Sequence, residues 1–281
     1  MKIKITADST CDLSGELIER YGVGIIPLHV IMDGKVYEDG VNIAPQDIFS
    51  YVKASGKLPT TAACSVEEYK EFFAKELESC DCVIHINISS KASVTHENAV
   101  FAAKNFKGKV FAVDSYALST GQGLLVLKAC DLIKEGKSAK ETVSVIESLR
   151  PNVNTSFVPD ALDYLHKGGR CSLAALMGAK VLKLHPMIDM KDGKLYAKKK
   201  YMGGIERCLK NYVNELAEEY KNYDKSRCFI THSCCEAEVV EKVREQVKSL
   251  FQFDEIYETV AGNVVTSHCG KGTLGVLFIY E

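Results

Sequence analysis

KIKITADST, residues 2–10, reads as a short apolar strand over residues 2–7 that runs directly into the polar sequence Asp8-Ser9-Thr10. Similar runs predict strands at residues 25–32, 82–88 and 110–113. Between the strands, a helix begins at the Ser65 cap and a longer one spans residues 118–135. Short strands alternating with amphipathic helices predict an α/β fold with a mainly parallel sheet covered on both faces.

Hydroxyl side chains cluster where these predicted strands end. They are Ser9 after the first strand, Ser90 and Ser93 after the third, Ser115 after the fourth, and Thr60 and Thr61 just before the Ser65 helix. In open α/β sheets, ligands bind in the loops that leave the carboxyl ends of the strands. The sequence therefore predicts a binding site with a polar rim over an apolar base.

The second half of the chain does not continue the alternation of strands and helices. The pattern breaks between residues 149 and 158, where two prolines and two asparagines favour a passage between domains. We place the domains at residues 1–152 and 153–281, and expect the second to be α+β with a mixed or antiparallel sheet. Asp192-Gly193 predicts a tight hairpin. Further helices are predicted at residues 205–220 and 237–250, and strands at 228–232 and 274–280.

Charge and hydropathy exclude several classes of partner. Lys and Arg (35) nearly balance Asp and Glu (37), so no strong field would gather nucleic acid or an anionic membrane surface. Neither a signal peptide nor a run of about 18 apolar residues is present, so we expect a cytoplasmic protein without stable membrane insertion. The 11 cysteines have no framework spacing and are expected to be reduced.

Several motifs resemble catalytic signatures but lack their context. GKGTLG at residues 270–275 precedes a final strand rather than a helix, which argues against a dinucleotide site. No P-loop occurs, so the chain is not expected to be a kinase. The pairs of Cys and His near residues 232–235 and 268–269 lack C-x-x-C spacing, and we predict no metal site. An enzymatic alternative remains, in which His268 activates Ser93 in a hydrolase or transferase acting on a lipid ester or phosphate.

Gly168-Gly169-Arg170 combines a flexible backbone with a side chain suited to carboxylate or phosphate. Residues of this kind indicate either an anion site or a surface loop.

Seven blocks spread over nearly the whole chain resemble the DegV family of bacterial fatty-acid-binding proteins. In family order they are ITADSTCDL (5–13), PTTAACSVEEY (59–69), INISSKASVTHENA (86–99), VDSYALSTGQGLLV (113–126), YLHKGGRCS (164–172), LHPMIDMKDGKL (184–195) and TSHCGKGTLGV (266–276). The chain departs from the usual family pattern beside the expected site, notably at Ala62, Ala63, Cys64, Val94 and Cys269.

The resemblance implies a two-domain protein that holds a long-chain fatty acid in a tunnel between its domains and performs no chemistry. It implies that Thr61 and Ser93 hydrogen-bond the carboxylate, with Arg170 and His268 beside it. Supporting positions would be Ser9, Thr60, Ser90, Ser115, Gly169 and Gly270.

At about 0.8 kcal/mol per buried methylene, a C16–C18 acid would be held mainly by its chain. No cofactor is expected. The resemblance further implies a protein partner, a fatty acid kinase that phosphorylates the presented carboxylate for phospholipid synthesis.

Overall fold

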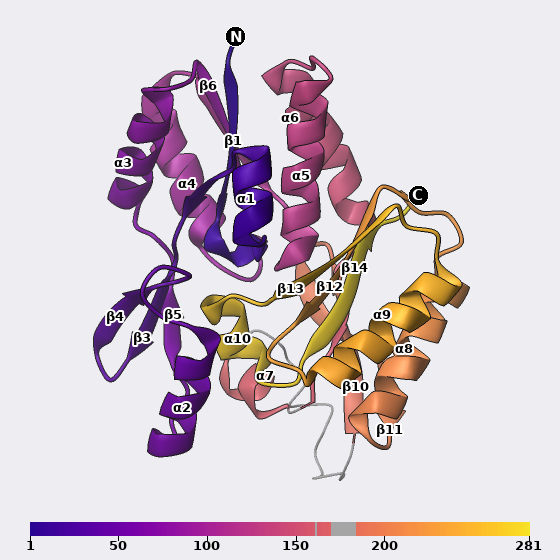
Figure 1. The fold of residues 1–281 in the computed structure, drawn as a ribbon. Helices are drawn as coiled ribbons and strands as arrows, with labels where there is room; N and C mark the ends of the chain where they lie inside the picture. The colour runs from indigo at the N-terminus through magenta and orange to yellow at the C-terminus, as the bar shows by residue number, and fades with distance from the viewer. Residues whose placement is uncertain (161, 170–183) are drawn as a thin grey trace.

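The computed structural model describes residues 1–160, 162–169 and 184–281 (Figure 1). Its first sheet is parallel, with strand order β2-β1-β6-β7. The strands are β1 (Ile3–Asp8), β2 (Gly24–Ile26), β6 (Cys82–Asn87) and β7 (Val110–Asp114). All four run in the same direction, so their carboxyl ends and the loops that follow them meet at one edge.

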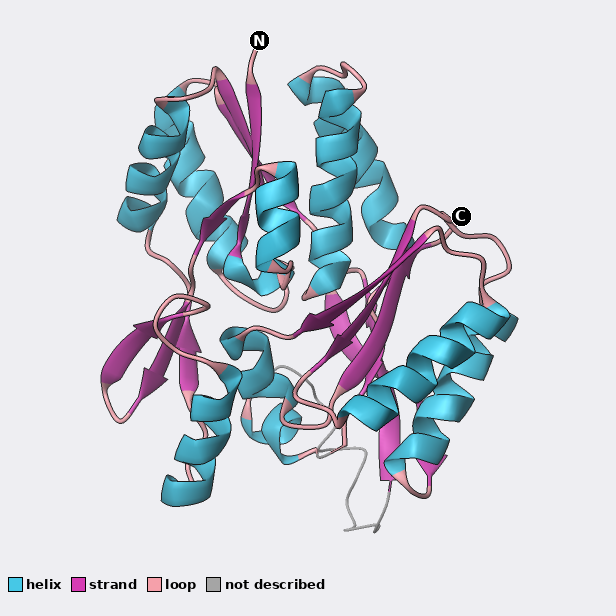
Figure 2. Cartoon of the chain, viewed as in Figure 1, coloured by secondary structure: helices cyan, strands magenta, loops and turns pink. Residues whose placement is uncertain are grey.

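Helices cover both faces of this sheet (Figure 2). They are α1 (Gly15–Tyr21), α3 (Val66–Leu77), α4 (Thr95–Ala103), α5 (Thr120–Lys134) and α6 (Ala139–Leu149), with short 3₁₀ turns at Ser9–Cys11, Lys104–Phe106 and Arg150–Asn152. Leu124 and Leu127 of α5 pack with Ile84 on one face, whereas Tyr69 and Phe73 of α3 belong to the core on the other. The predicted doubly covered α/β sheet is confirmed.

The second sheet is mixed, in the order β11-β10-β9-β14-β12-β13, with β8 paired to β14. Its strands are β8 (Val153–Asn154), β9 (Phe157–Val158), β10 (Leu184–Lys191), β11 (Lys194–Met202), β12 (Arg227–His232), β13 (Glu255–Val260) and β14 (Leu274–Ile279). Its helices are α7 (Asp163–Lys167), α8 (Ile205–Glu219), α9 (Ala237–Leu250) and α10 (Asn263–Cys269). The predicted hairpin is present, with Asp192 and Gly193 both at positive φ.

The predicted strand over residues 25–32 is wrong as a single element. It divides at Pro27 into β2 and β3 (His29–Met32), which lie in different sheets. Proline lacks the N–H that a continuing ladder needs, so the chain leaves the parallel sheet there. β3 instead forms a small antiparallel sheet with β4 (Lys35–Glu38) and β5 (Thr60–Ala62), next to α2 (Pro45–Ser55).

The chain passes from the first sheet to the second within residues 149–158, where the alternation of predicted strands and helices breaks. Val153 is the first residue of β8, and the described strands from there onward belong to the second sheet. A division into domains at residues 152 and 153 stays an interpretation of this pattern. Within the described ranges, no helix combines the length and apolar character needed to cross a membrane.

Candidate binding site

A cavity of about 620 Å³ lies between the two halves of the chain. Its lining is mainly apolar: Leu28, Ala62, Ala63, Ile88, Ala92, Val94, Leu118, Leu165, Leu195, Val264, Val265 and Cys269. Polar side chains enter it from Thr61, Ser90, Lys91, Ser93, Asn98 and His268. The volume is in the range of about 300–1,000 Å³ that small-molecule pockets occupy.

Thr61 and His268 meet in this cavity although 207 positions separate them in the sequence. Thr61 Oγ1 lies 2.8 Å from His268 Nε2. Thr61 is held by the antiparallel pairing of β5 with β3, in which it faces Val30. His268 stands in the last turn of α10. The small sheet of the first half and a helix of the second half thus each contribute a polar side chain to the cavity wall.

Ser93 lines the same cavity, directly before α4. Its Oγ lies 2.6 Å from Thr95 Oγ1 and accepts a hydrogen bond from the Thr95 N–H at 3.3 Å. The positive end of a helix dipole is therefore beside this hydroxyl. Such a position favours a bound anion.

Two buried carboxylates of the first half anchor α10. Asp12 Oδ1 accepts a hydrogen bond from the Gly262 N–H at 2.9 Å, and Asp39 Oδ1 accepts one from the Asn263 N–H at 2.7 Å. Burial raises the pKa of Asp12 well above its ordinary value, although the hydrogen bond from Ser119 opposes that rise. These contacts fix the helix that carries His268 against the first half.

The backbone of Gly168 also touches His268. A Cβ built at Gly168 would lie 2.7 Å from His268 Nδ1 and 2.8 Å from the Tyr164 carbonyl oxygen. Only a residue without a side chain allows this approach. Gly168, the first glycine of the Gly-Gly pair noted in the sequence, therefore contributes to the position of the imidazole.

The structure brings together three of the four predicted principal residues, Thr61, Ser93 and His268, and adds Ser90 to the lining. Arg170, the fourth, lies outside the described residues.

The remaining predicted supporting residues are not among those that line the cavity. Ser9 Oγ donates to Asp39, and Ser115 Oγ donates to the Ala117 carbonyl. Thr60, the first residue of β5, is exposed. Gly169, which follows α7, is exposed as well. Gly270 packs against the Tyr164 ring, where a Cβ would come within 2.6 Å of the ring. None of these five residues belongs to the described cavity wall.

Sequence reasoning missed Lys91 and Asn98 as lining residues and the two anchoring aspartates. Lys91 and Asn98 lie in the same block as Ser93, so the loop that follows β6 could have suggested them. The anchoring role of Asp12 and Asp39 depends on contacts with residues more than 220 positions away, and no local pattern reports it.

Chemically, the mainly apolar cavity wall also carries hydroxyl and imidazole groups that can hydrogen-bond a ligand. The hydrogen bond of His268 Nε2 goes to Thr61, and that of the Ser93 hydroxyl goes to Thr95. This arrangement suits binding of an amphipathic molecule with an anionic head. Fold and cavity together define an α/β protein with a mainly apolar cavity between the two halves of its chain.

Comparisons with known proteins agree with this description. The model of the family described as "Uncharacterised protein, DegV family" matches residues 2–281. A DegV domain-containing protein of Deinococcus radiodurans is 32% identical over 280 residues, covering 98% of each chain. The chain therefore belongs to the DegV family.

Solved structures of relatives share the fold over essentially the full length. A fatty-acid-binding DegV family protein from Thermus thermophilus superposes with a TM-score of 0.90, at 32% identity and with all of both chains covered. A stearic-acid-binding protein from Eubacterium ventriosum superposes with a TM-score of 0.86 at 26% identity, covering 99% of this chain and 98% of that one. The fold class and the family predicted from the sequence are thus confirmed.

Proposed function

We propose that this protein is a non-enzymatic carrier that binds one long-chain fatty acid in the cavity between its two halves. The observation that carries the proposal is the mainly apolar 620 Å³ cavity with Thr61, Ser93 and His268 at its polar part. Fatty-acid binding by the Thermus thermophilus and Eubacterium ventriosum relatives supports it.

The polar residues suit a carboxylate head group. Thr61 and Ser93 provide hydroxyl donors, and the N-terminal end of α4 lies directly after Ser93. Hydrogen bonds to a charged group contribute about 1.5–3 kcal/mol each, more than those between neutral groups. A carboxylate bound here avoids the cost of several kcal/mol that an unpaired buried ion incurs.

The apolar walls suit the acyl chain. Leucine and valine side chains reach the cavity from the loop after β2, from α7, from β11 and from α10. At about 0.8 kcal/mol per buried methylene, a chain of a dozen or more methylenes provides most of the gross binding energy. We expect an acid in the C16–C18 range to remain bound through purification.

The hydrogen bonds of the described site also favour binding over hydrolysis. A serine nucleophile needs a general base within hydrogen-bonding reach. Here the Ser93 hydroxyl pairs with Thr95, while His268 Nε2 pairs with Thr61. The two side chains line one cavity without forming a nucleophile–base pair with each other.

We include a fatty acid kinase as the partner in this proposal. A carrier that encloses the chain and keeps the carboxylate at a polar end leaves the head group as the part presented to another protein. The product of that step would be an acyl phosphate, formed by transfer of a phosphoryl group from ATP to the carboxylate.

The test combines ligand extraction with phosphoryl transfer. The purified protein, a bacterial fatty acid kinase and ATP should give an acyl phosphate that hydroxylamine traps as a hydroxamate. The Ser93→Ala variant should hold less fatty acid and give less product. If the protein binds fatty acid but yields no more acyl phosphate than free acid does, the proposed carrier function stands and the proposed kinase partner is refuted.

A further inference from the structure

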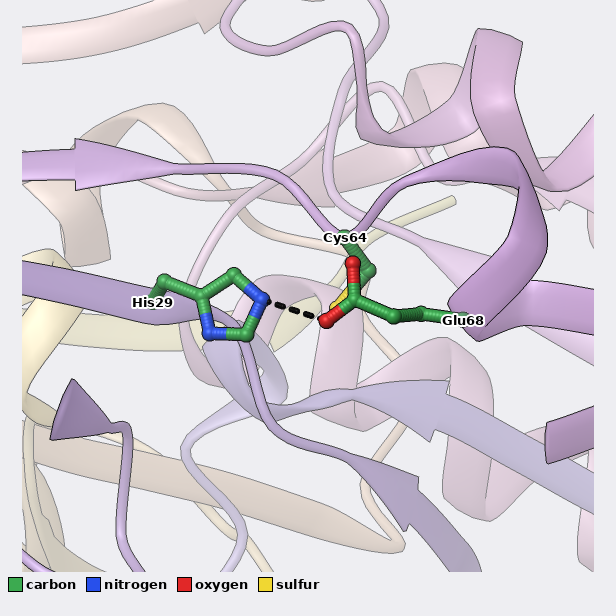
Figure 3. A group of neighbouring side chains, drawn as sticks. All are labelled: His29, Cys64 and Glu68. Atoms are coloured by element: carbon green, nitrogen blue, oxygen red, sulfur yellow. Dashed lines mark hydrogen bonds and ion pairs between the residues drawn. The ribbon is translucent and has the colours of Figure 1, made fainter. Parts of the chain in front are cut away.

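His29, Cys64 and Glu68 form a cluster outside the cavity wall (Figure 3). The potential ligand atoms, one from each side chain, all lie within 4.8 Å of one another. His29 Nε2 and Glu68 Oε1 are 2.7 Å apart, and the Cys64 thiol lies beside them, donating to the Pro27 carbonyl at 3.0 Å. Nothing in the proposed fatty-acid binding uses these three side chains.

The local fold places the three residues together. Antiparallel pairing of β3 with β5 sets His29 opposite Ala62, two residues before Cys64. Ser65 then caps α3, and Glu68 is the third residue after the cap. Glu68 Oε2 accepts a hydrogen bond from the Ser65 N–H at 2.7 Å, which leaves Oε1 directed at His29. The carboxylate is therefore oriented by the backbone before any ligand binds.

The Cys64 position is fixed as well. Its carbonyl accepts a hydrogen bond from Asn98 Nδ2 at 2.8 Å, and its side chain is buried with 1% exposure. His29 is half-buried and Glu68 forms the solvent side of the cluster. A cation would thus enter past Glu68 and bind against a buried sulfur.

The donor set matches a particular class of cation. Imidazole nitrogen, cysteine sulfur and carboxylate oxygen are the three ligand types that zinc takes, and three protein ligands with one open position is a recurrent zinc arrangement. Thiolate and imidazole disfavour magnesium and calcium, which prefer all-oxygen sites. One thiolate and one carboxylate would neutralise a divalent ion.

The geometry needs only a small adjustment. Zinc ligands at about 2.0–2.1 Å from the metal in a tetrahedron lie about 3.4 Å apart. The nitrogen and oxygen of His29 and Glu68 would therefore separate by less than 1 Å from their 2.7 Å hydrogen bond. His29 Nδ1 has no hydrogen-bond partner in the described part of the chain. Coordination through Nε2 places the ring proton on Nδ1, and the Nε2 lone pair is then available to the metal.

We propose that His29 Nε2, Cys64 Sγ and Glu68 Oε1 form a binding site for Zn²⁺, with a water as the fourth ligand. Binding forms the zinc–nitrogen, zinc–sulfur and zinc–oxygen bonds and breaks the Cys64 S–H bond. The thiol proton is released to solvent, so zinc affinity falls as the pH is lowered. The ion would fasten β3 to the start of α3.

The test is a zinc titration of the chelator-treated full chain against a chromophoric zinc indicator. We expect one zinc per chain, a rise in melting temperature with added zinc, and a near-ultraviolet thiolate-to-metal absorption when Co²⁺ replaces zinc. Cys64→Ser should abolish that absorption and weaken zinc binding more than tenfold, since removal of even an outer partner of a metal ligand costs about 10–100-fold.

A matched control uses a different place in the described chain where cysteines lie near a histidine. Cys235 N–H donates to His232 Nδ1, and Cys234 precedes it. The Cys234→Ser/Cys235→Ser double variant should bind zinc like the unaltered protein. If that variant loses zinc while Cys64→Ser keeps it, or if no stoichiometric binding occurs, the proposal is overturned.

A second variant covers the case in which Cys64→Ser does not fold. Glu68→Gln retains an oxygen that can accept the Ser65 N–H bond but removes the charge. It should fold normally and bind zinc at least tenfold more weakly. Unchanged zinc affinity in folded Glu68→Gln would contradict the proposal.

Discussion

Thr61→Val tests the role of one hydroxyl while keeping the side chain's shape. Thr61 Oγ1 lies in the cavity, 2.8 Å from His268 Nε2. Valine fills nearly the same volume, so the acyl cavity should be unchanged, whereas the head group loses one donor. A hydrogen bond to a charged group contributes about 1.5–3 kcal/mol, which corresponds to a roughly 10- to 150-fold weaker affinity for the fatty acid.

The assay is displacement of a fluorescent fatty acid from delipidated protein. Thr60→Val is the matched control, because Thr60 is the preceding residue of β5 and is exposed outside the cavity. It should bind like the unaltered protein. The loss of the Thr61–His268 bond should separately lower the free energy of unfolding by about 1 kcal/mol. Equal affinities of the Thr61 and Thr60 variants would refute the assignment of Thr61 to the carboxylate.

Three further outcomes are expected. Ala63→Leu adds side-chain volume to the cavity wall, so competition assays should show reduced affinity for long acids relative to shorter ones; an unchanged preference would place the acyl chain elsewhere. Burial lowers the pKa of His85 to about 3, while an unfolded histidine titrates near 6.5. The free energy of unfolding should therefore fall by up to about 1.4 kcal/mol per unit as the pH drops from about 6.5 toward 3. His85→Gln should flatten that slope in denaturant titrations. A model acyl ester should be hydrolysed no faster by the unaltered protein than by Ser93→Ala; turnover that disappears in the variant would establish a hydrolase instead.

The sequence was most informative where the local pattern and the tertiary environment agree. The strand at residues 2–7, the helix at 118–135 and the Asp192-Gly193 hairpin appear as β1, α5 and the β10–β11 turn. Each has strong hydrophobic periodicity or turn chemistry. In contrast, α10 has only seven residues and begins Asn-Val-Val-Thr, so its β-branched residues do not indicate a helix. Its anchors on Asp12 and Asp39 supply what local propensity does not.

The site was only partly predictable for a similar reason. Local composition showed many hydroxyls at the strand ends but not which of them would face the cavity. Ser9 and Ser115 hydrogen-bond away from the cavity, whereas Ser90 and Ser93 line it. The contact between His268 and Thr61 joins distant parts of the chain. Hydrophobic periodicity reports only local structure, so this proximity was suggested by the family resemblance alone.

The His29, Cys64 and Glu68 cluster was likewise not predictable from local sequence patterns. The sequence favoured no metal site because the adjacent cysteine and histidine pairs lack zinc spacing. His29 is the first residue of β3, Cys64 lies two residues after β5, and Glu68 stands in the first turn of α3. The pairing of β3 with β5 brings His29 to the other two side chains. Metal ligands assembled across a sheet leave no compact motif in the sequence.

The central claim is that the cavity holds a fatty acid, and native mass spectrometry of the purified protein tests it most directly. We expect one ligand of long-chain fatty-acid mass per chain, released by denaturing extraction and depleted in Ser93→Ala. Unaltered protein that carries no such ligand and takes up no added long-chain acid would contradict the claim.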